Sequence, residues 1–477
     1  MSSTQGRRPY SGITDLQGAL DGIATLSGDG IEILDAAGFR AGLVDDLLYT
    51  SLFGDGDVKA AARWVIRVAA PVLGAFPASI HDLYIAAGRG AYMNRTAPAI
   101  NVRGLTYDTA RTILRAARAT DNKIVLFELA RSEMGYTDQR PGEYATNILA
   151  AAIKEGHHGP VFIQGDHYQA SLATYGKDPE GEIAAVRDLA LEAMAAGYFN
   201  IDIDASTLVD LSFPTLAEQQ RNNYVHSAAL TQAIRAAEPE GVTISIGGEI
   251  GEVGKENSTV DDLHAFMQGY EAELARLGAE TGTTLTGISK ISVQTGTSHG
   301  GVVLADGSIA EVSVDFATLA ALSEAARTAY GMGGAVQHGA STLPEEAFGQ
   351  FAEANAIEVH LATAFQNRLY DSAQFPADLK DAIYAHLAAN NGNERKAGMT
   401  DAQFYYTTRK KGFGPFKRQL SDLPEETRGA LMAELEPVYA LIMERLGVAG
   451  SAALVDEIVR PVIVPVVAPE ALRASVR

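Results

Sequence analysis

The chain has 477 residues, 47% of them hydrophobic and 20% charged, which is ordinary for a folded globular protein and excludes extensive disorder. A formal net charge of −21 opposes binding to nucleic acid or to an anionic membrane, and the absence of cysteine excludes disulfides and thiolate metal sites. No apolar run reaches the roughly 18 residues of a membrane span, and residues 1–10 are polar without a signal core, so we expect a cytoplasmic protein.

In chain order, residues 1–95 are predicted to form a helical N-terminal extension, with candidate helices at 43–53 and 58–72. We assign no chemistry to this part. Residues 96–374 then show a strand-like and helix-like rhythm that repeats eight times. The expected strands are short and rich in β-branched or aromatic residues, at 99–102, 124–129, 161–164, 199–203, 243–246, 288–293, 335–337 and 357–361.

Eight strand and helix units predict an α/β fold, a closed parallel TIM (β/α)8 barrel. The helices between the strands include those expected at 183–196, 217–237, 260–277 and 316–330. The alternative, an open doubly wound sheet, ranks behind because its glycine-rich phosphate-binding turn is missing after the first strand, where Asn101–Leu105 holds one glycine.

Residues 375–477 are predicted to form a mainly helical C-terminal extension. A basic stretch at 409–417 interrupts it, and an apolar segment at 459–467 closes it. Pro461 and Pro465 make this last segment a poor central strand. We expect it to pack against the barrel or to form the interface of a homodimer or homotetramer.

Four short phrases at the ends of apolar runs carry histidine or carboxylate residues, at 164–168, 247–251, 296–300 and 336–340. His167, His299 and His338, with Glu249 as a possible fourth ligand, have the composition of a divalent-metal site. In the barrel they follow strands three, six, seven and five. Since the carboxyl ends of parallel barrel strands meet at one mouth, the four residues are expected to converge there.

The motifs in this order resemble the class II, metal-dependent ketose-bisphosphate aldolases, over roughly residues 95–370. The resemblance is carried by Asn-Val at 101–102, Asp-His at 166–167, Ile-Asp-x-Ser at 203–206, Glu-Ile-Gly at 249–251, Ser-His-Gly at 298–300 and His-Gly-x-Ser at 338–341. It implies a zinc ion on the three histidines, with Glu249 as a fourth or alternate ligand. Other divalent transition metals would also suit nitrogen and oxygen donors.

The same resemblance implies roles for three further carboxylates. Asp166 would be the acid/base that takes the proton from the hydroxyl group of the carbon that becomes the aldehyde. Asp204 would orient a ligand histidine. Glu256, in the loop at 252–258, would exchange the proton on the enediolate carbon.

The residues expected to contact the substrate depart from the family pattern at several positions. Gly339 and Ser341 remain as donors to a phosphate, but the Asn and Asp expected at the eighth strand are His360 and Ala362, and no lysine follows His299 and Gly300. Arg131, Ser132, Arg409, Lys410 and Lys411 are candidates to replace the lost anion contacts. The expected substrate-binding residues are Asn101, Ser132, Gly300, Gly339, Ser341, His360 and Thr363.

The function these patterns favour is a zinc-dependent aldolase of carbohydrate metabolism, such as glycolysis. It would cleave or form a phosphorylated ketose from dihydroxyacetone phosphate and an aldehyde, through a metal-stabilised enediolate. Two alternatives stay open: a non-catalytic, sugar-phosphate-binding subunit with an aldolase-like barrel, and a metal-dependent barrel hydrolase.

Overall fold

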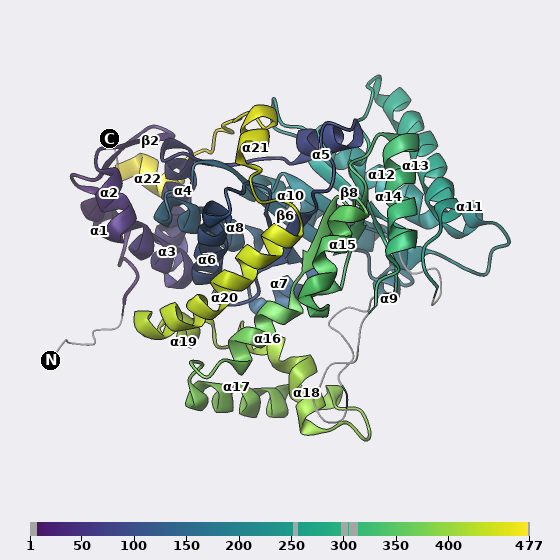
Figure 1. The fold of residues 1–477 in the computed structure, drawn as a ribbon. Coiled ribbons are helices and arrows are strands. Elements are labelled where there is room, and N and C mark those ends of the chain that lie inside the picture. Colours follow the sequence, from purple (N-terminus) through teal and green to yellow (C-terminus); the bar gives the residue numbers. More distant parts are fainter. Residues whose placement is uncertain (1–6, 251–255, 297–303, 305–312, 476–477) are drawn as a thin grey trace.

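The computed structural model describes residues 7–250, 256–296, 304 and 313–475. Eight parallel strands close into a barrel, because the last of them pairs with the first and each of the others pairs with its neighbours in chain order. Helices surround this barrel (Figure 1). The predicted TIM barrel is confirmed, and its strands are β4 Ala97–Asn101, β5 Leu126–Ala130, β6 Gly159–Gln169, β7 Asn200–Asp204, β8 Ser245–Glu249, β9 Lys290–Val293, β10 Ala335–Gln337 and β11 Glu358–Leu361.

Each barrel strand is followed by a helix that packs on the outside of the sheet. Most strand residues are buried, as expected for a parallel sheet that is covered on its outer face and filled inside. Helix starts are set by side-chain caps, for example Asp178 before α10 and Thr259 before α13. The helices are α6 Thr106–Ala119, α8 Pro141–Lys154, α10 Pro179–Ala196, α12 Arg221–Ala236, α13 Val260–Thr281, α14 Phe316–Tyr330, α15 Phe348–Glu353 and α16 Thr363–Asp371, with the short α7 Arg131–Thr137, α9 Leu172–Tyr175 and α11 Leu216–Gln219.

The N-terminal extension packs on one side of the barrel and is helical apart from a two-stranded antiparallel hairpin and one further strand, β3, which pairs with the start of β6. The hairpin was not predicted from the sequence, since its strands are only four residues long. The elements of this part are α1 Ile13–Leu20, β1 Ala24–Ser27, β2 Gly30–Ile33, α2 Ala36–Gly38, α3 Val44–Phe53, α4 Gly56–Val72, β3 Ala75–Pro77 and α5 His81–Gly88.

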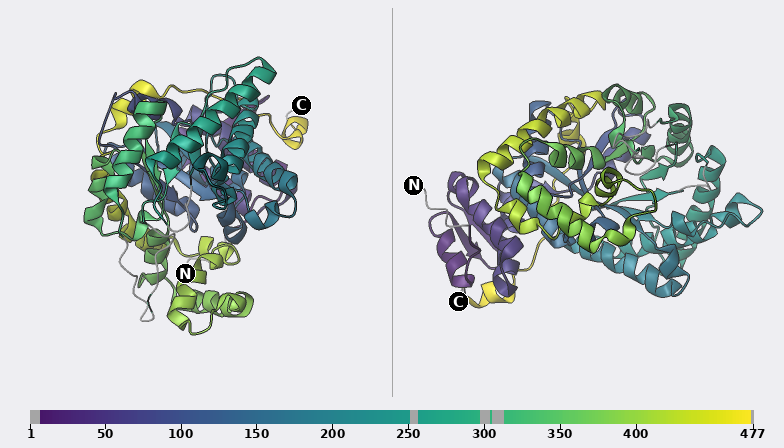
Figure 2. Two further views of the ribbon diagram at one scale, coloured as in Figure 1. Left: turned by 90° about the vertical axis from the view of Figure 1, so that its right-hand side faces the viewer. Right: turned by 90° about the horizontal axis from the view of Figure 1, so that it is seen from below.

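The C-terminal extension crosses the molecule and brings the end of the chain back to the N-terminal helices (Figures 1 and 2). Trp64 on α4 donates to the carbonyl of Val466 at 2.9 Å, so the apolar closing segment packs against α4. Ile463 and Val467 remain exposed, and an interface with a second subunit there stays a prediction. The helices are α17 Ala377–Asn390, α18 Asp401–Thr408, α19 Lys417–Ser421, α20 Glu425–Arg445, α21 Ala452–Ile458 and α22 Glu470–Ser475. No helix among the described residues is long and apolar enough to span a membrane.

The barrel interior is charged, although such interiors are usually filled by branched apolar side chains. Glu128, Gln164, Asp202, Lys290 and Glu358 come from five different strands and are all buried. The ammonium group of Lys290 lies 2.5 Å from Glu358 Oε1, 2.9 Å from Asp202 Oδ1 and 2.8 Å from Gln164 Oε1. Burial lowers the pKa of Lys290, but Asp202 and Glu358 outweigh that effect and raise it above its usual value. Lys290 is therefore a structural cation.

Replacing Lys290 with methionine should lower the free energy of unfolding by about 3–5 kcal/mol, because Asp202 and Glu358 would remain buried without their cation. Urea denaturation followed by circular dichroism measures this. Lys123→Met is the matched control: Lys123 pairs with the half-exposed Asp456 and should contribute no more than about 1 kcal/mol. Equal losses in both variants would contradict the role given to Lys290.

Candidate metal and acid/base site

Four of the residues predicted to form the site meet at the barrel mouth, at the ends of β6, β7, β8 and β10. His167 Nδ1 lies 3.1 Å from Asp204 Oδ2 and 3.0 Å from Glu249 Oε2. His167 Nε2 lies 2.9 Å from His338 Nδ1, and His338 Nε2 lies 3.0 Å from the hydroxyl of Ser292 on β9. His299 and Gly300 lie outside the described residues.

A β-bulge in β6 turns Asp166 and His167 to the same side. The pairing with β7 shifts between Gly165 and Tyr168, so two residues of β6 lie opposite one of β7. His167 has φ of 40°, in the left-handed region that costs a non-glycine residue free energy. Neighbouring side chains of a regular strand point to opposite faces. The bulge is thus the reason that both side chains reach the mouth.

Gly165 makes room for this bulge. A Cβ atom at this position would lie 2.4 Å from the ring of Tyr168, which is fully buried. A larger residue would force either the ring or the strand to move.

The donor set fits a divalent metal ion. The ligand atoms of Asp166, His167 and His338 lie within 4.8 Å of one another, as do those of His167, Asp204 and Glu249. The distance between the facing nitrogens of His167 and His338 is 2.9 Å. This is close to the distance of about 3.3 Å between two nitrogens that bind the same tetrahedral ion. Nδ1 of His167 then faces carboxylates, the usual arrangement behind a metal-binding histidine.

The carboxylates around His167 favour the protonated form of its ring. Burial lowers the pKa of His167, but Glu249 and Asp166 outweigh burial and raise it well above its usual value. Burial, and the neighbouring charge of Asp204, raise the pKa of Glu249. A metal ion would compete with the proton on His167, so binding should release protons.

Asp166 is a buried carboxylate held in its ionised form. Its Oδ2 accepts from Asn101 Nδ2 at 2.8 Å, and its Oδ1 accepts from His360 Nδ1 at 3.1 Å. Burial alone would raise the pKa of Asp166, but the positive charges of His167 and His360 and the bonds from His360 and Asn101 hold it well below its usual range. The carboxylate is therefore unprotonated at neutral pH, which is the form that a proton acceptor needs.

His360 connects the site to the charged barrel interior. Its Nε2 lies 2.6 Å from Glu358 Oε1, and its Nδ1 lies 3.1 Å from Glu128 Oε1 as well as from Asp166. Burial lowers the pKa of His360, but Glu128 and Asp166 outweigh burial and raise it well above its usual value. The ring lines the mouth, but both of its nitrogens already face carboxylates. Its direct contact is with the base, and its predicted contact with substrate stays a prediction.

A pocket of about 490 Å³ opens above these groups. Among the residues predicted to bind substrate, its lining includes Asn101, Ser132, Gly339, Ser341, His360 and Thr363. Arg103, Glu133 and Tyr136 also line it, and no motif in the sequence had singled them out. Glu133 accepts from Asn101 at 2.9 Å and pairs with Arg103 at 2.6 Å. Because Asn101 also donates to Asp166, Glu133 helps to position the side chain that holds Asp166.

Glu256 does not line this pocket. It is exposed and follows directly on residues 251–255, which lie outside the described part of the chain. Its neighbour Asn257 donates to Asp315, the cap of α14, at 3.4 Å. The role of Glu256 in proton exchange stays a prediction.

The comparisons with known proteins agree with this fold. The family model of fructose-bisphosphate aldolase class-II matches residues 82–411, which is most of the chain, so the protein belongs to this family. No curated protein matches it.

Among solved structures, a probable tagatose 6 phosphate kinase from Sinorhizobium meliloti 1021 aligns with a TM-score of 0.53 and 16% identity, over 74% of this chain and 97% of that one. Fructose-bisphosphate aldolase from Campylobacter jejuni aligns with a TM-score of 0.45 and 15% identity, over 79% and 96%. The fructuronate-tagaturonate epimerase UxaE from Cohnella laeviribosi gives 0.47 and 12%, over 93% and 90%. At these identities the first match supports the barrel fold alone.

His338→Ala should remove most of the bound metal, because one of the two described imidazoles is lost and the remaining donors cannot complete a catalytic site. Metal content per chain, measured by inductively coupled plasma mass spectrometry, checks this. His264→Ala is the control, since His264 bonds to Tyr330 on the outer helices, away from the mouth. Stoichiometric metal in His338→Ala would refute the assignment.

Proposed function

We propose that the protein is a metal-dependent aldolase that cleaves or forms a phosphorylated ketose, with dihydroxyacetone phosphate and an aldehyde as the two halves. The observation that carries this is the pairing of an ionised, buried Asp166 with the facing nitrogens of His167 and His338. Membership of the class II aldolase family supports the same reaction type.

His167 and His338 would hold the metal through their facing nitrogens, together with the predicted ligand His299. Glu249 lies at Nδ1 of His167, away from those nitrogens, and its role as a fourth or alternate ligand stays a prediction. Zinc is the ion we propose, since nitrogen and carboxylate ligands with an open position suit it. The bound ion supplies Lewis-acid stabilisation of the negative charge that develops beside the substrate carbonyl when the carbon–carbon bond breaks.

Asp166 takes the proton from the hydroxyl group of the carbon that becomes the aldehyde, and returns it in the condensation direction. Asn101 donates to Oδ2 of this carboxylate and His360 to Oδ1, so both of its oxygens are held. The carboxylate of Asp166 therefore does not need to reorient when substrate binds. Its position relative to the two imidazoles is set beforehand.

The phosphate of dihydroxyacetone phosphate would bind at Gly339, Ser341 and Thr363. Gly339, with φ of 71°, follows β10 and lines the pocket, and Ser341 Oγ accepts from the amide of Ala364 at the start of α16. The first amides of a helix carry partial positive charge and bind phosphate well.

The direct test incubates the purified protein with candidate ketose phosphates and detects dihydroxyacetone phosphate with a coupled dehydrogenase. Release of this product supports the aldolase. Release of inorganic phosphate or another hydrolysis product instead would identify a barrel hydrolase, and tight binding without turnover would identify a non-catalytic subunit.

Chelation by EDTA should abolish the activity, and zinc should restore it, whereas borohydride with substrate should not inactivate. Lys290 is buried in ion pairs and cannot form a Schiff base. Activity before and after treatment, with mass spectrometry of the intact chain, measures both effects. A reduced substrate adduct on any lysine would overturn the mechanism.

Asp166→Ala should keep its metal while the rate of cleavage falls by about 10²- to 10⁴-fold, the usual contribution of a positioned proton-transfer group. Exchange of the proton next to the carbonyl of dihydroxyacetone phosphate should fall less, because that step does not involve the hydroxyl that Asp166 deprotonates. Metal analysis, steady-state kinetics and exchange in deuterated water provide the three readouts. Loss of metal, or an equal fall of both rates, would show that Asp166 acts otherwise.

A further inference from the structure

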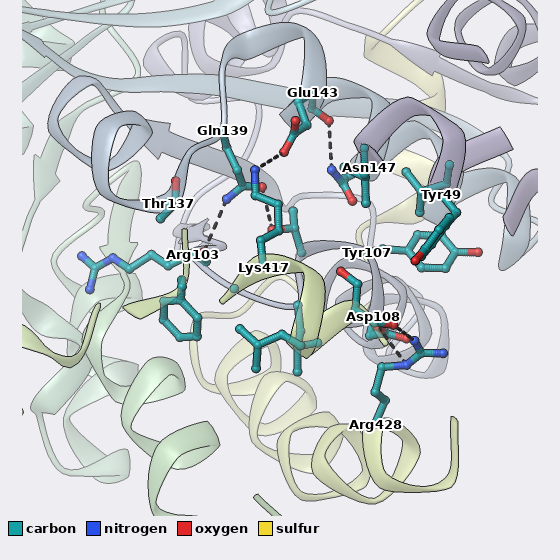
Figure 3. A pocket seen from close by; sticks show the side chains of 18 of the residues that line it. Tyr49, Arg103, Tyr107, Asp108, Thr137, Gln139, Glu143, Asn147, Lys417 and Arg428 are labelled. Carbon is teal, nitrogen blue, oxygen red and sulfur yellow. Dashed lines mark hydrogen bonds and ion pairs between the residues drawn. The ribbon is translucent and has the colours of Figure 1, made fainter. Parts of the chain in front are cut away.

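The N-terminal extension contacts the barrel both at its outer helices and at the end opposite to the mouth. Figure 3 shows the first kind of contact, where Tyr49 on α3 and Tyr107 on α6 line the same pocket. Tyr107 donates to Asp45 on α3 at 2.7 Å, and Lys154 on α8 lies 2.6 Å from the same carboxylate. These bonds join α3 to helices on the outside of the barrel.

The second contact is made by α5, which begins at the end of the barrel opposite to the mouth. The amide of Ile80, just before α5, donates to Asn200 Oδ1 at 2.8 Å, and Ser79 Oγ accepts from the amide of Ser245 at 3.0 Å. Asn200 and Ser245 are the first residues of β7 and β8, so these bonds place the start of α5 at the amino ends of the strands. Residues at this end of such a barrel usually serve stability and not chemistry.

Tyr84 on α5 reaches into the barrel interior from this end. Its side chain is fully buried, and its hydroxyl group donates to Glu358 Oε2. The ammonium group of Lys290 lies 6.0 Å from the centroid of the Tyr84 ring, which is within the range of a cation–π contact. Burial, and then the charge of Glu358, raise the pKa of Tyr84 well above its usual value, so the phenol remains a hydrogen-bond donor.

The two oxygens of Glu358 have different numbers of donors. Oε1 accepts from Lys290, Gln164 and His360. Tyr84 is the donor that Oε2 has among the described residues. Without the hydroxyl group of Tyr84, Oε2 would be buried with no donor, and an unsatisfied charged group costs more than a neutral one. The carboxylate would then turn to bring Oε2 towards Lys290, and Oε1 would move away from His360.

A continuous line of hydrogen bonds runs from Tyr84 to the base at the mouth. Glu358 and His360 are two residues apart on β11, so their side chains point to the same side of the strand. Glu358 Oε1 lies 2.6 Å from His360 Nε2, and His360 Nδ1 lies 3.1 Å from Asp166 Oδ1. Each side chain in this line fixes the orientation of the next one, from α5 to the mouth.

We propose that Tyr84 is a positioning residue of the reaction: through Glu358 and His360, it fixes the orientation of the carboxylate of Asp166. This inference rests on the proposed function for the role of Asp166. It gives the N-terminal extension a part in the reaction, although the extension contributes none of the described residues that line the pocket at the mouth.

The test compares Tyr84→Phe with Tyr107→Phe, the matched control. Each substitution removes a tyrosine hydroxyl group that donates to a carboxylate between the N-terminal extension and the rest of the chain, Glu358 for Tyr84 and Asp45 for Tyr107. In the metal-loaded full chain, Tyr84→Phe should lower kcat for cleavage by about 10- to 100-fold, the cost of a small misplacement of a catalytic group. KM should stay within about twofold, because the groups that bind substrate are unchanged. Tyr107→Phe should change neither value.

Two further measurements separate positioning from a loss of stability. Exchange of the proton next to the carbonyl of dihydroxyacetone phosphate should fall less than cleavage, because that step does not use Asp166 as its base. In the Asp166→Ala background, Tyr84→Phe should cause no further loss, since a residue that acts through Asp166 then has nothing to position. A loss as large in this background as in the wild type, or equal falls of cleavage and exchange, would overturn the inference.

Nuclear magnetic resonance tests the line of hydrogen bonds without turnover. In protein labelled with ¹⁵N-histidine, Tyr84→Phe should shift the ring nitrogen signals of His360, which are identified by their absence from His360→Gln. Tyr107→Phe should leave these signals in place. Unchanged His360 signals in Tyr84→Phe would also overturn the inference. A protein that shows the shift but releases no dihydroxyacetone phosphate would refute the proposed function and leave the link from Tyr84 to His360 standing.

Discussion

A charge that is removed from water must be compensated where it lies, and this constraint shapes the barrel from its interior to its mouth. Glu358 accepts from Lys290, His360, Gln164 and Tyr84. His360 is held between this carboxylate and Asp166. The ionised base at the mouth therefore depends on a layer of ion pairs beneath it, and the chemistry and the stability of the barrel share the same residues.

Much of the architecture could be predicted from the sequence. The eight strands could be predicted because each contains a short run rich in apolar, β-branched or aromatic residues. Parallel strands are buried on both faces, and this burial favours such runs. The meeting of His167, Asp204, Glu249 and His338 followed from the topology, since each ends a strand of one barrel. Family likeness added roles for the individual residues, and these roles stay predictions.

The interior ion pairs could not be predicted. Glu128 and Lys290 stand out as single charges in apolar runs, but their partners are distant in sequence, and pairing depends on register and on which face of the strand each residue occupies. His360 illustrates the limit. The sequence placed it at the mouth, whereas its bonds to Glu358 and Asp166 appear only in three dimensions. The same holds for the basic stretch of the C-terminal extension. Arg409 pairs with Asp371 and Lys411 with Glu394, whereas Lys410 lines the pocket, and the sequence could not tell the three apart.

The bulge in β6 links two tasks that a regular strand would keep apart. Because Asp166 and His167 reach the mouth through one irregular turn of the backbone, neither can be repositioned without moving the other. A positive φ at a histidine costs about 1–3 kcal/mol of free energy. The site is the reason that this conformation is kept. A lineage that lost the chemistry would be free to return this residue to a regular strand. The bulge can thus serve as a structural marker that separates catalytic barrels of this kind from relatives that only bind.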